Sequence, residues 1–424
     1  MKKTDYPELD ETLYTRVLEN GLTVVVVPRK GFTKKLAYFV TDYGSIHTEF
    51  VLDGKVHKAP AGVAHYLEHK MFDLPGKRDV SAEFAAMGAM TNAFTSYDMT
   101  AYYFSTTENF DPCLRLLLEF VSTPYFTQES VEKERGIIAQ EIGMNLDSPD
   151  SVVFDSLMES LYHCHPIRVP ILGTSETIRE ITPEVLYACH RAFYTPDNML
   201  LCVVGDVDPE NVVAIAREVL GTQHREPGIK VKDWPEPMTR VVPEVTANME
   251  VSMPMFNLAF KCEPVDRGAA GIRTEMVADL AAEALFGESS ELYLKLYEEG
   301  LIDSSFGGGF ETIDGCAMLM CSGDSDDAHA VRDAVLAQGR RIAREGIPAK
   351  RFLRMKRSAL GRRIRSLDSF DATCFRICAY HFSDFDYFRF PEVYRSIEAT
   401  EIQGFLNRVV TEERCSLSII HPLD

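Results

Sequence analysis

The stretch PAGVAHYLEHKMF, Pro60–Phe72, places two histidines and a glutamate at helical spacing. The proline at its start and the Pro-Gly pair soon after its end predict a helix over residues 61–72. His65 and His69 are four residues apart, so both imidazoles project from one helix face, one turn apart. That separation suits two ligands of a single Zn²⁺, and Glu68 is placed to reach a water molecule beside the metal. The alternative interpretation is a surface helix that carries these residues by chance.

A catalytic zinc also needs a third protein ligand and an open fourth position. Farther along, Gln128–Leu146 predicts a long helix that carries Glu134 and Glu141, two turns apart on one face. We expect that face to be shared with Ile137 and Ile138. An unpaired carboxylate on an apolar face costs several kcal/mol, so a zinc ion opposite is a natural partner. The alternative is an ordinary solvated glutamate on a charged helix.

The surrounding segments alternate between strand and helix patterns. Strands are predicted at GLTVVVVP (21–28), at AYFVTDY (37–43) as its hairpin partner, and near 90–95 and 101–105, with a helix at 112–121. The connections between strands are too short for parallel crossovers. We therefore expect an α+β fold with antiparallel or mixed sheets and helices packed on one face.

Two halves of the chain repeat the same order of elements. Thr182–Val204 and the segment that begins at Ala399 both read as an amphipathic helix, a short polar break and a buried strand. Between the halves, residues 224–245 hold four prolines and no periodic pattern, which is typical of a linker. The predicted domains are therefore 1–223, with the metal site, and 246–424, a related domain without catalytic residues.

Composition excludes several functional classes. The chain has 424 residues, of which 46% are hydrophobic and 25% charged, and its formal net charge of −20 argues against a nucleic-acid partner. The start, MKKTDYPELDETLY, has no apolar run, and no later run is long enough for a bilayer, so we expect no signal peptide, anchor or membrane partner. The 10 scattered cysteines fit reduced thiols in the cytoplasm.

The motifs together resemble a known family. The inverted motif H-x-x-E-H is followed 76 residues after His65 by the end of EKERGIIAQE. This pairing is similar to the insulinase or pitrilysin zinc metallopeptidases, which include the mitochondrial processing peptidases. The closest resemblance is to the bacterial branch of elongation factor P 5-aminopentanol modification-associated proteins. It extends through GAMTNAFTSYDMTAYYFS (88–105), the HP…ILGT stretch (165–174) and TPDNMLLCVVGDV (195–207).

The resemblance implies a fold and a set of roles. The fold is two homologous domains of the processing-peptidase and LuxS-like metallohydrolase type. The implied zinc ligands are His65, His69 and Glu141, and Glu134 is implied as a supporting carboxylate behind them. Glu68 would be the catalytic base. The strand with Asn92 and Ala93 corresponds to an edge strand that pairs with an extended peptide, although a simple core strand is the alternative.

One part of the family pattern is missing. Relatives carry an R-x6-Y pair in the second half that binds substrate and stabilises the oxyanion. Here Leu296 and Asp303 stand at those positions, and neither side chain is a donor at neutral pH. We therefore expect a heterodimer with a paralogous inactive subunit that supplies the Arg and Tyr, and otherwise a homodimer.

Three hypotheses for function follow. The first is a zinc endopeptidase subunit that hydrolyses short or unfolded peptides inside a closed chamber. The second and third are a peptide-binding subunit that does not cut and an inert structural subunit of the same fold. His163 and His165 could chelate a metal, but the resemblance places them in a structural loop. The stretch Arg340–Arg365 has eleven basic residues against one acid, which fits solvated helix faces more than a docking surface.

Overall fold

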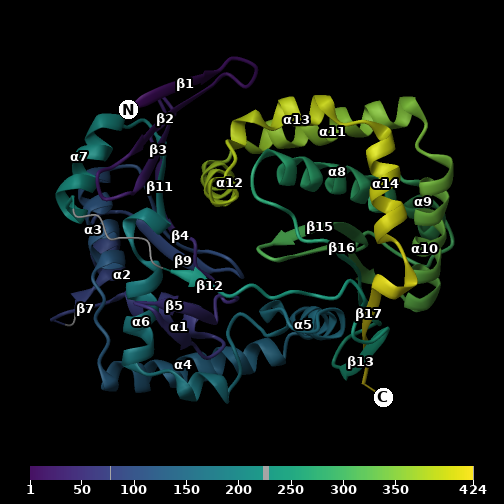
Figure 1. Ribbon diagram of the computed structural model, residues 1–424, viewed down its shortest axis with the longest axis horizontal. Helices are drawn as coiled ribbons and strands as arrows, with labels where there is room; N and C mark the ends of the chain where they lie inside the picture. Colours follow the sequence, from purple (N-terminus) through teal and green to yellow (C-terminus); the bar gives the residue numbers. More distant parts are fainter. Residues whose placement is uncertain (77, 223–228, 424) are drawn as a thin grey trace.

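The computed structural model describes residues 1–76, 78–222 and 229–423, which form two α+β halves side by side (Figure 1). The strands of the first half are β1 (Lys2–Tyr6), β2 (Glu11–Val17), β3 (Thr23–Pro28), β4 (Lys35–Thr41), β5 (Glu49–Leu52), β6 (Lys55–Lys58), β7 (Asp73–Leu74), β8 (Arg78–Asp79), β9 (Met90–Thr95), β10 (Thr100–Thr106) and β11 (Met199–Gly205). Its helices are α1 (Val63–Met71), α2 (Val80–Ala86), α3 (Phe110–Ser122), α4 (Gln128–Leu146), α5 (Pro149–Leu161), α6 (Pro183–Phe193) and α7 (Pro209–Leu220).

The second half has the same mixture of elements. The short strand β12 (Lys230–Val231) pairs with β5 of the first half. The strands of the second half are β13 (Glu244–Met249), β14 (Met255–Cys262), β15 (Gly307–Ile313), β16 (Cys316–Asp324) and β17 (Cys415–Pro422). Its helices are α8 (Ala269–Phe286), α9 (Glu291–Glu298), α10 (Ala328–Glu345), α11 (Ala349–Ser366), α12 (Phe370–Phe382), α13 (Phe390–Ser396) and α14 (Ala399–Val409).

From β3 onward, the first main sheet has the same strand topology as the whole of the second, which confirms the predicted repeat. The first has the order β1-β2-β3-β11-β4-β10-β9 and the second the order β13-β17-β14-β16-β15. In each, one parallel pair, β3 with β11 or β13 with β17, is followed by antiparallel pairs out to a free edge strand, β9 or β15. The predicted match of Thr182–Val204 with the segment from Ala399 corresponds to α6–β11 and α14–β17. The sheets are mixed, as expected.

One predicted pairing is wrong. The strand at 37–43 was expected to form a hairpin with the strand at 21–28, but β11 lies between β3 and β4. Every residue of β11 is buried, and its MLLCVV run fits a central strand that is covered on both faces. The free energy gained by burying this apolar run in the middle of the sheet outweighs the preference of a short loop for a direct β3–β4 hairpin.

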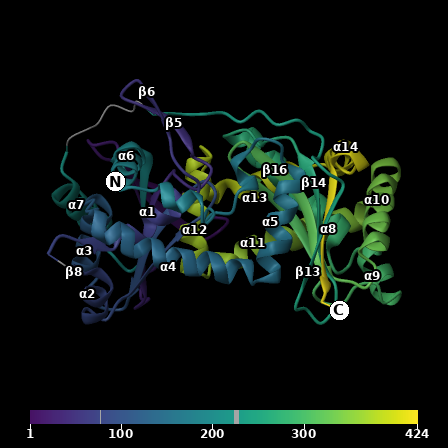
Figure 2. The same cartoon turned by 90° about the horizontal axis from the view of Figure 1, so that it is seen from below.

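Each sheet has its own helices on one face, as predicted, and one helix from the other half on the opposite face. Helix α12 packs on β11 and β4 of the first sheet, where Cys374 and Cys378 join a core cluster with Cys202. Helix α5 packs on β17 and β14 of the second sheet through residues such as Leu157 and Leu161. Both exchanged helices lie in the middle of the molecule (Figures 1 and 2). The exchange joins the two halves through their cores.

The predicted linker at 224–245 lies partly outside the described residues. Its described part contains β12 and the first residues of β13. Glu236, in the same segment, has a side chain only 2% exposed that bonds Lys261 Nζ at 2.8 Å. The same carboxylate accepts backbone hydrogen bonds from residues 163–165. The proposed domain limits of 223 and 246 stay predictions.

The basic stretch Arg340–Arg365 covers the end of α10 and nearly all of α11. Part of its charge is used within the chain: Arg363, with a side chain only 13% exposed, bonds Asp279 at 2.7 Å, and Arg362 bonds Glu283 at 2.7 Å. None of the helices in the described part of the chain combines the length and the hydropathy that a membrane span requires.

Candidate metal centre

Helix α1 is held in place at its start by a close backbone contact. Gly62, which precedes it, has φ of +90°, and a Cβ there would lie 2.4 Å from the carbonyl oxygen of Leu172. Glycine is therefore required where the ILGT stretch meets the helix. Along α1 almost every side chain is buried, and the helix packs against α4, α6 and β9. A motif that reads as a surface helix from its polar residues is an interior helix in the fold.

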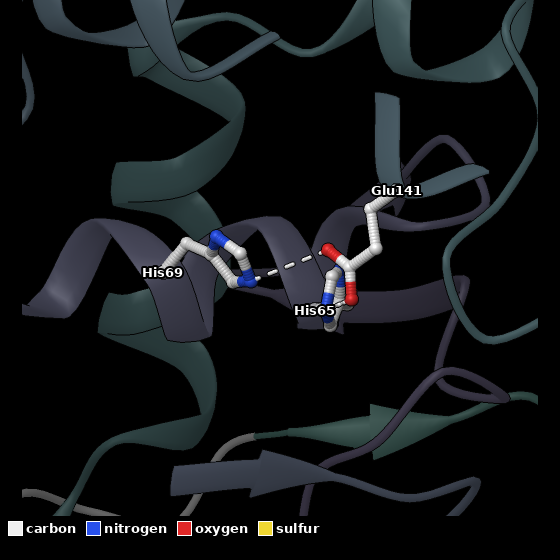
Figure 3. A group of neighbouring side chains, drawn as sticks. All are labelled: His65, His69 and Glu141. Atoms are coloured by element: carbon white, nitrogen blue, oxygen red, sulfur yellow. Dashed lines mark ion pairs between the residues drawn. The ribbon is translucent and has the colours of Figure 1, made fainter. Parts of the chain in front are cut away.

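The structure brings His65, His69 and Glu141 together (Figure 3). Their ligand atoms all lie within 4.8 Å of one another, and within the described ranges this is the one such group of three or more His, Cys, Asp or Glu residues. The Nε2 atom of His65 is 3.6 Å from one Glu141 oxygen, and the Nε2 atom of His69 is 3.7 Å from the other. Both imidazoles therefore direct the same ring nitrogen toward one carboxylate.

These spacings fit a zinc ion. Two ligands of a tetrahedral zinc at about 2.1 Å stand roughly 3.4 Å apart. The two observed nitrogen–oxygen separations, 3.6 and 3.7 Å, are close to that value. Two imidazoles and a carboxylate are also a ligand set that zinc uses in catalytic sites. Burial lowers the pKa of His65 to about 4, which leaves its imidazole neutral, the form that binds metal.

Glu134 lies behind the cluster and contacts His69. Its Oε1 atom is 3.0 Å from His69 Nδ1, so the ring can donate to the carboxylate while Nε2 stays free for a metal. Burial opposes ionisation of this pair, but the hydrogen bond and nearby charges outweigh it, raising the pKa of His69 and lowering that of Glu134.

The predicted apolar face of α4 is half wrong: Ile138 is buried, whereas Ile137 is 45% exposed.

Glu68 is buried next to the cluster and accepts a hydrogen bond from a neighbouring strand. Thr95, at the end of β9, donates its hydroxyl to Glu68 Oε2 at 2.6 Å. Burial raises the pKa of Glu68, and the Thr95 hydrogen bond opposes that rise. Thr95 was not predicted as a site residue. It lies in the stretch 88–105, but no sequence signal pairs this strand residue with a residue on helix α1.

Comparison with known proteins decides the family. The model described as "Insulinase (Peptidase family M16)" matches residues 54–175, and "Peptidase M16 inactive domain" matches residues 180–359. An uncharacterized zinc protease of Bacillus subtilis, YmfH, is 37% identical over 428 residues, which cover 100% of this chain and 99% of that protein. The chain belongs to the insulinase family, M16. Its place in the elongation factor P modification-associated branch stays a prediction.

Solved structures agree with this assignment. A putative M16-like peptidase from Alicyclobacillus acidocaldarius is 32% identical, with a TM-score of 0.94 over 99% of this chain and 100% of that one. Two more distant structures show the same fold: a Helicobacter pylori protease (20% identical, TM-score 0.83, 97% and 99% covered) and a chain of complex III from Candida albicans (14% identical, TM-score 0.76, 96% and 95% covered).

In this M16 chain the predicted substrate-binding residues lie on a free edge. Asn92 and Ala93 belong to β9, which pairs with β10 on one side and, within the part of the chain that the structure describes, has no strand on the other. The Ala93 N–H donates to the Asn92 side-chain oxygen at 3.0 Å. The edge amide is therefore satisfied by its own neighbour. A peptide that pairs with Ala93 would replace this contact.

The positions of the missing Arg and Tyr lie far from the cluster. Leu296 is on α9, and both views show α9 and α1 at opposite ends of the molecule (Figures 1 and 2). Leu296 is fully buried in a hydrophobic core cluster, so its side chain faces no substrate. Asp303 is exposed, and a hydrogen bond from Ser305 lowers its pKa, which keeps it ionised at neutral pH.

The two histidines set aside in the sequence have structural contacts. Buried His165 accepts the N–H of Ile167 at Nδ1, 3.2 Å away, and its Nε2 is 3.1 Å from the Asp314 carbonyl oxygen. His163 Nε2 is 3.1 Å from the Thr239 carbonyl oxygen. These bonds tie the loop after α5 to the linker and to the β15–β16 turn.

Proposed function

We propose that this chain is the zinc-bearing subunit of a metalloendopeptidase that hydrolyses peptide bonds. The observation that carries the proposal is the convergence of His65, His69 and Glu141 beside the buried carboxylate of Glu68. When bound there, zinc supplies a Lewis acid that activates water and polarises the scissile carbonyl. Membership of a peptidase family and likeness to proteins named zinc proteases support the proposal.

In the proposed mechanism Glu68 moves the proton. Its carboxylate takes a proton from the attacking water and later delivers it to the leaving amine. The Thr95 hydroxyl holds Glu68 Oε2, so the other oxygen is free to face the water. The free edge of β9 holds the substrate as an added strand, through the main chain at Asn92 and Ala93. Backbone recognition of this kind suits extended, unfolded peptides of varied sequence.

A non-catalytic role of the same fold is the second candidate. The likeness to a chain of complex III shows that this fold also occurs in an assembly that is not named as a peptidase. Retention of a complete ligand set and of Glu68 favours the peptidase. A cytoplasmic location stays an expectation from the cysteine pattern.

Zinc content tests the metal site directly. We expect one zinc per wild-type chain and a loss of most of it in Glu141→Ala, because two imidazoles alone form a much weaker site. Glu129→Ala is the matched control, since Glu129 is an exposed glutamate on the same helix. Metal analysis of the purified proteins measures the outcome. Equal zinc in wild type and Glu141→Ala would remove Glu141 from the site.

Substitution of Thr95 tests how Glu68 is held. Thr95→Val is nearly isosteric but removes the donor, and hydrogen bonds to charged groups contribute about 1.5–3 kcal/mol. We expect kcat to fall by roughly 10- to 100-fold with little change in KM or zinc content. Thr95→Ser keeps the hydroxyl and should retain most of the activity. If Val and Ser give the same rate, the hydroxyl plays no part.

A further inference from the structure

A fully buried lysine lies directly behind the candidate metal centre. Lys70 follows His69 on α1 and is only 1% exposed. Lysine is almost never fully buried unless its charge is paired, because a lone ammonium loses its hydration in the interior. The groups that contact its ammonium therefore indicate the role of the charge.

The ammonium of Lys70 reaches three oxygen atoms on two elements. It bonds the carboxylate of Asp73, just past the end of α1, and the carbonyl oxygen of Ser130 on α4 at 3.4 Å. It also lies 3.8 Å from Glu134 Oε2. Asp73 is 47% exposed, so water screens it, whereas the side chain of Glu134 is only 16% exposed. Glu134 is thus the more buried of the two carboxylates that pair with Lys70.

The two oxygens of Glu134 have separate partners. Oε1 is 3.0 Å from His69 Nδ1, and Oε2 faces Lys70. Consecutive residues of α1 therefore hold one carboxylate from two sides. Attraction of Oε2 to Lys70 favours the orientation in which Oε1 faces His69 Nδ1, and that contact favours the ring orientation that directs Nε2 toward Glu141.

We propose that Lys70 is a positioning residue for the zinc site and acts through Glu134 on His69. This inference rests on the proposed zinc function. Charge balance supports it. Glu68, Glu134 and Glu141 would place three carboxylates near a divalent cation, and the ammonium of Lys70, which also bonds Asp73, adds a positive charge on the Glu134 side. Without it, Glu134 would be pushed away from the other two carboxylates.

The alternative role is a structural link between α1 and α4 that does not concern the metal. A double-mutant cycle on zinc affinity separates the two roles, because coupling appears only between residues that act together. Lys261→Met is the matched control: it removes another fully buried lysine, which pairs with Glu236 far from the cluster in the sequence. We expect it to lower stability without changing zinc affinity.

The experiment measures the zinc Kd by chelator competition in the full chain, for wild type, Lys70→Met, Glu134→Gln and the double variant. Removing the partner of a metal-bound histidine typically costs 10- to 100-fold in metal affinity. We expect a loss of about that size for Glu134→Gln, roughly 10-fold for Lys70→Met, and no further loss in the double variant. If Lys70→Met does not fold, Lys70→Gln takes its place, because the amide keeps a donor and removes only the charge.

Three results would overturn the inference: unchanged Kd in the Lys70 variant, losses that multiply in the double variant, or an equal loss in Lys261→Met. None of these touches the proposed function as long as wild type binds zinc and Glu141→Ala does not. Failure of the wild-type chain to bind zinc at all would contradict the proposed function itself.

Discussion

Replacing Glu68 with Gln is expected to abolish peptide hydrolysis while leaving the fold and the zinc in place. The amide has nearly the same shape but cannot accept a proton, and general base catalysis contributes about 10²- to 10⁴-fold to a rate. Thr95 would still find an acceptor in the amide oxygen, so the local hydrogen bond is kept. The measurement is kcat on an unstructured peptide, in the assembly that is active, together with zinc content.

Glu129→Gln, on the exposed surface of α4, controls for the loss of one negative charge. It should match wild type in both measurements. A comparable rate from Glu68→Gln would show that another group takes the proton. A loss of zinc along with activity would instead indicate that Glu68 supports the metal, and its assigned role would be wrong.

The isolated chain is expected to be nearly inactive and to gain activity with a second polypeptide of the same fold that carries the Arg and Tyr. In this chain Leu296 is buried and Asp303 is an exposed, ionised carboxylate. A homodimer would place that carboxylate where a carbonyl oxygen becomes negative. Loss of one oxyanion donor alone costs about 10²- to 10³-fold, and a like charge opposes the transition state further.

The test is to assay the chain alone, the partner alone and the two mixed. We expect the mixture to exceed either component by roughly 10²-fold or more. A mixture that contains the Glu68→Gln chain should remain inactive, which would place the cleavage at this chain's zinc site. Full activity from the purified chain alone would exclude the two-component assembly and leave the zinc site unaffected.

Local patterns in the sequence predict much of this molecule. The helix at Gln128–Leu146 and the strand at Met90–Thr95 begin and end where they were predicted, because their boundaries depend on caps and alternation within a few residues. The spacing of His65 and His69 is also local, since one helical turn sets it. The repeat of helix, break and strand predicted the two related halves.

Contacts between distant segments were decided only by the tertiary structure. No local pattern indicates that α5 and α12 each pack on the sheet of the other half, or that β11 lies between β3 and β4. Thr95 and Lys70 likewise became visible as site residues only when β9 and α4 were placed beside α1. The physical reason is that capping and periodicity depend on near neighbours in the chain, whereas burial of apolar faces and pairing of buried charges depend on which segments the whole fold brings together.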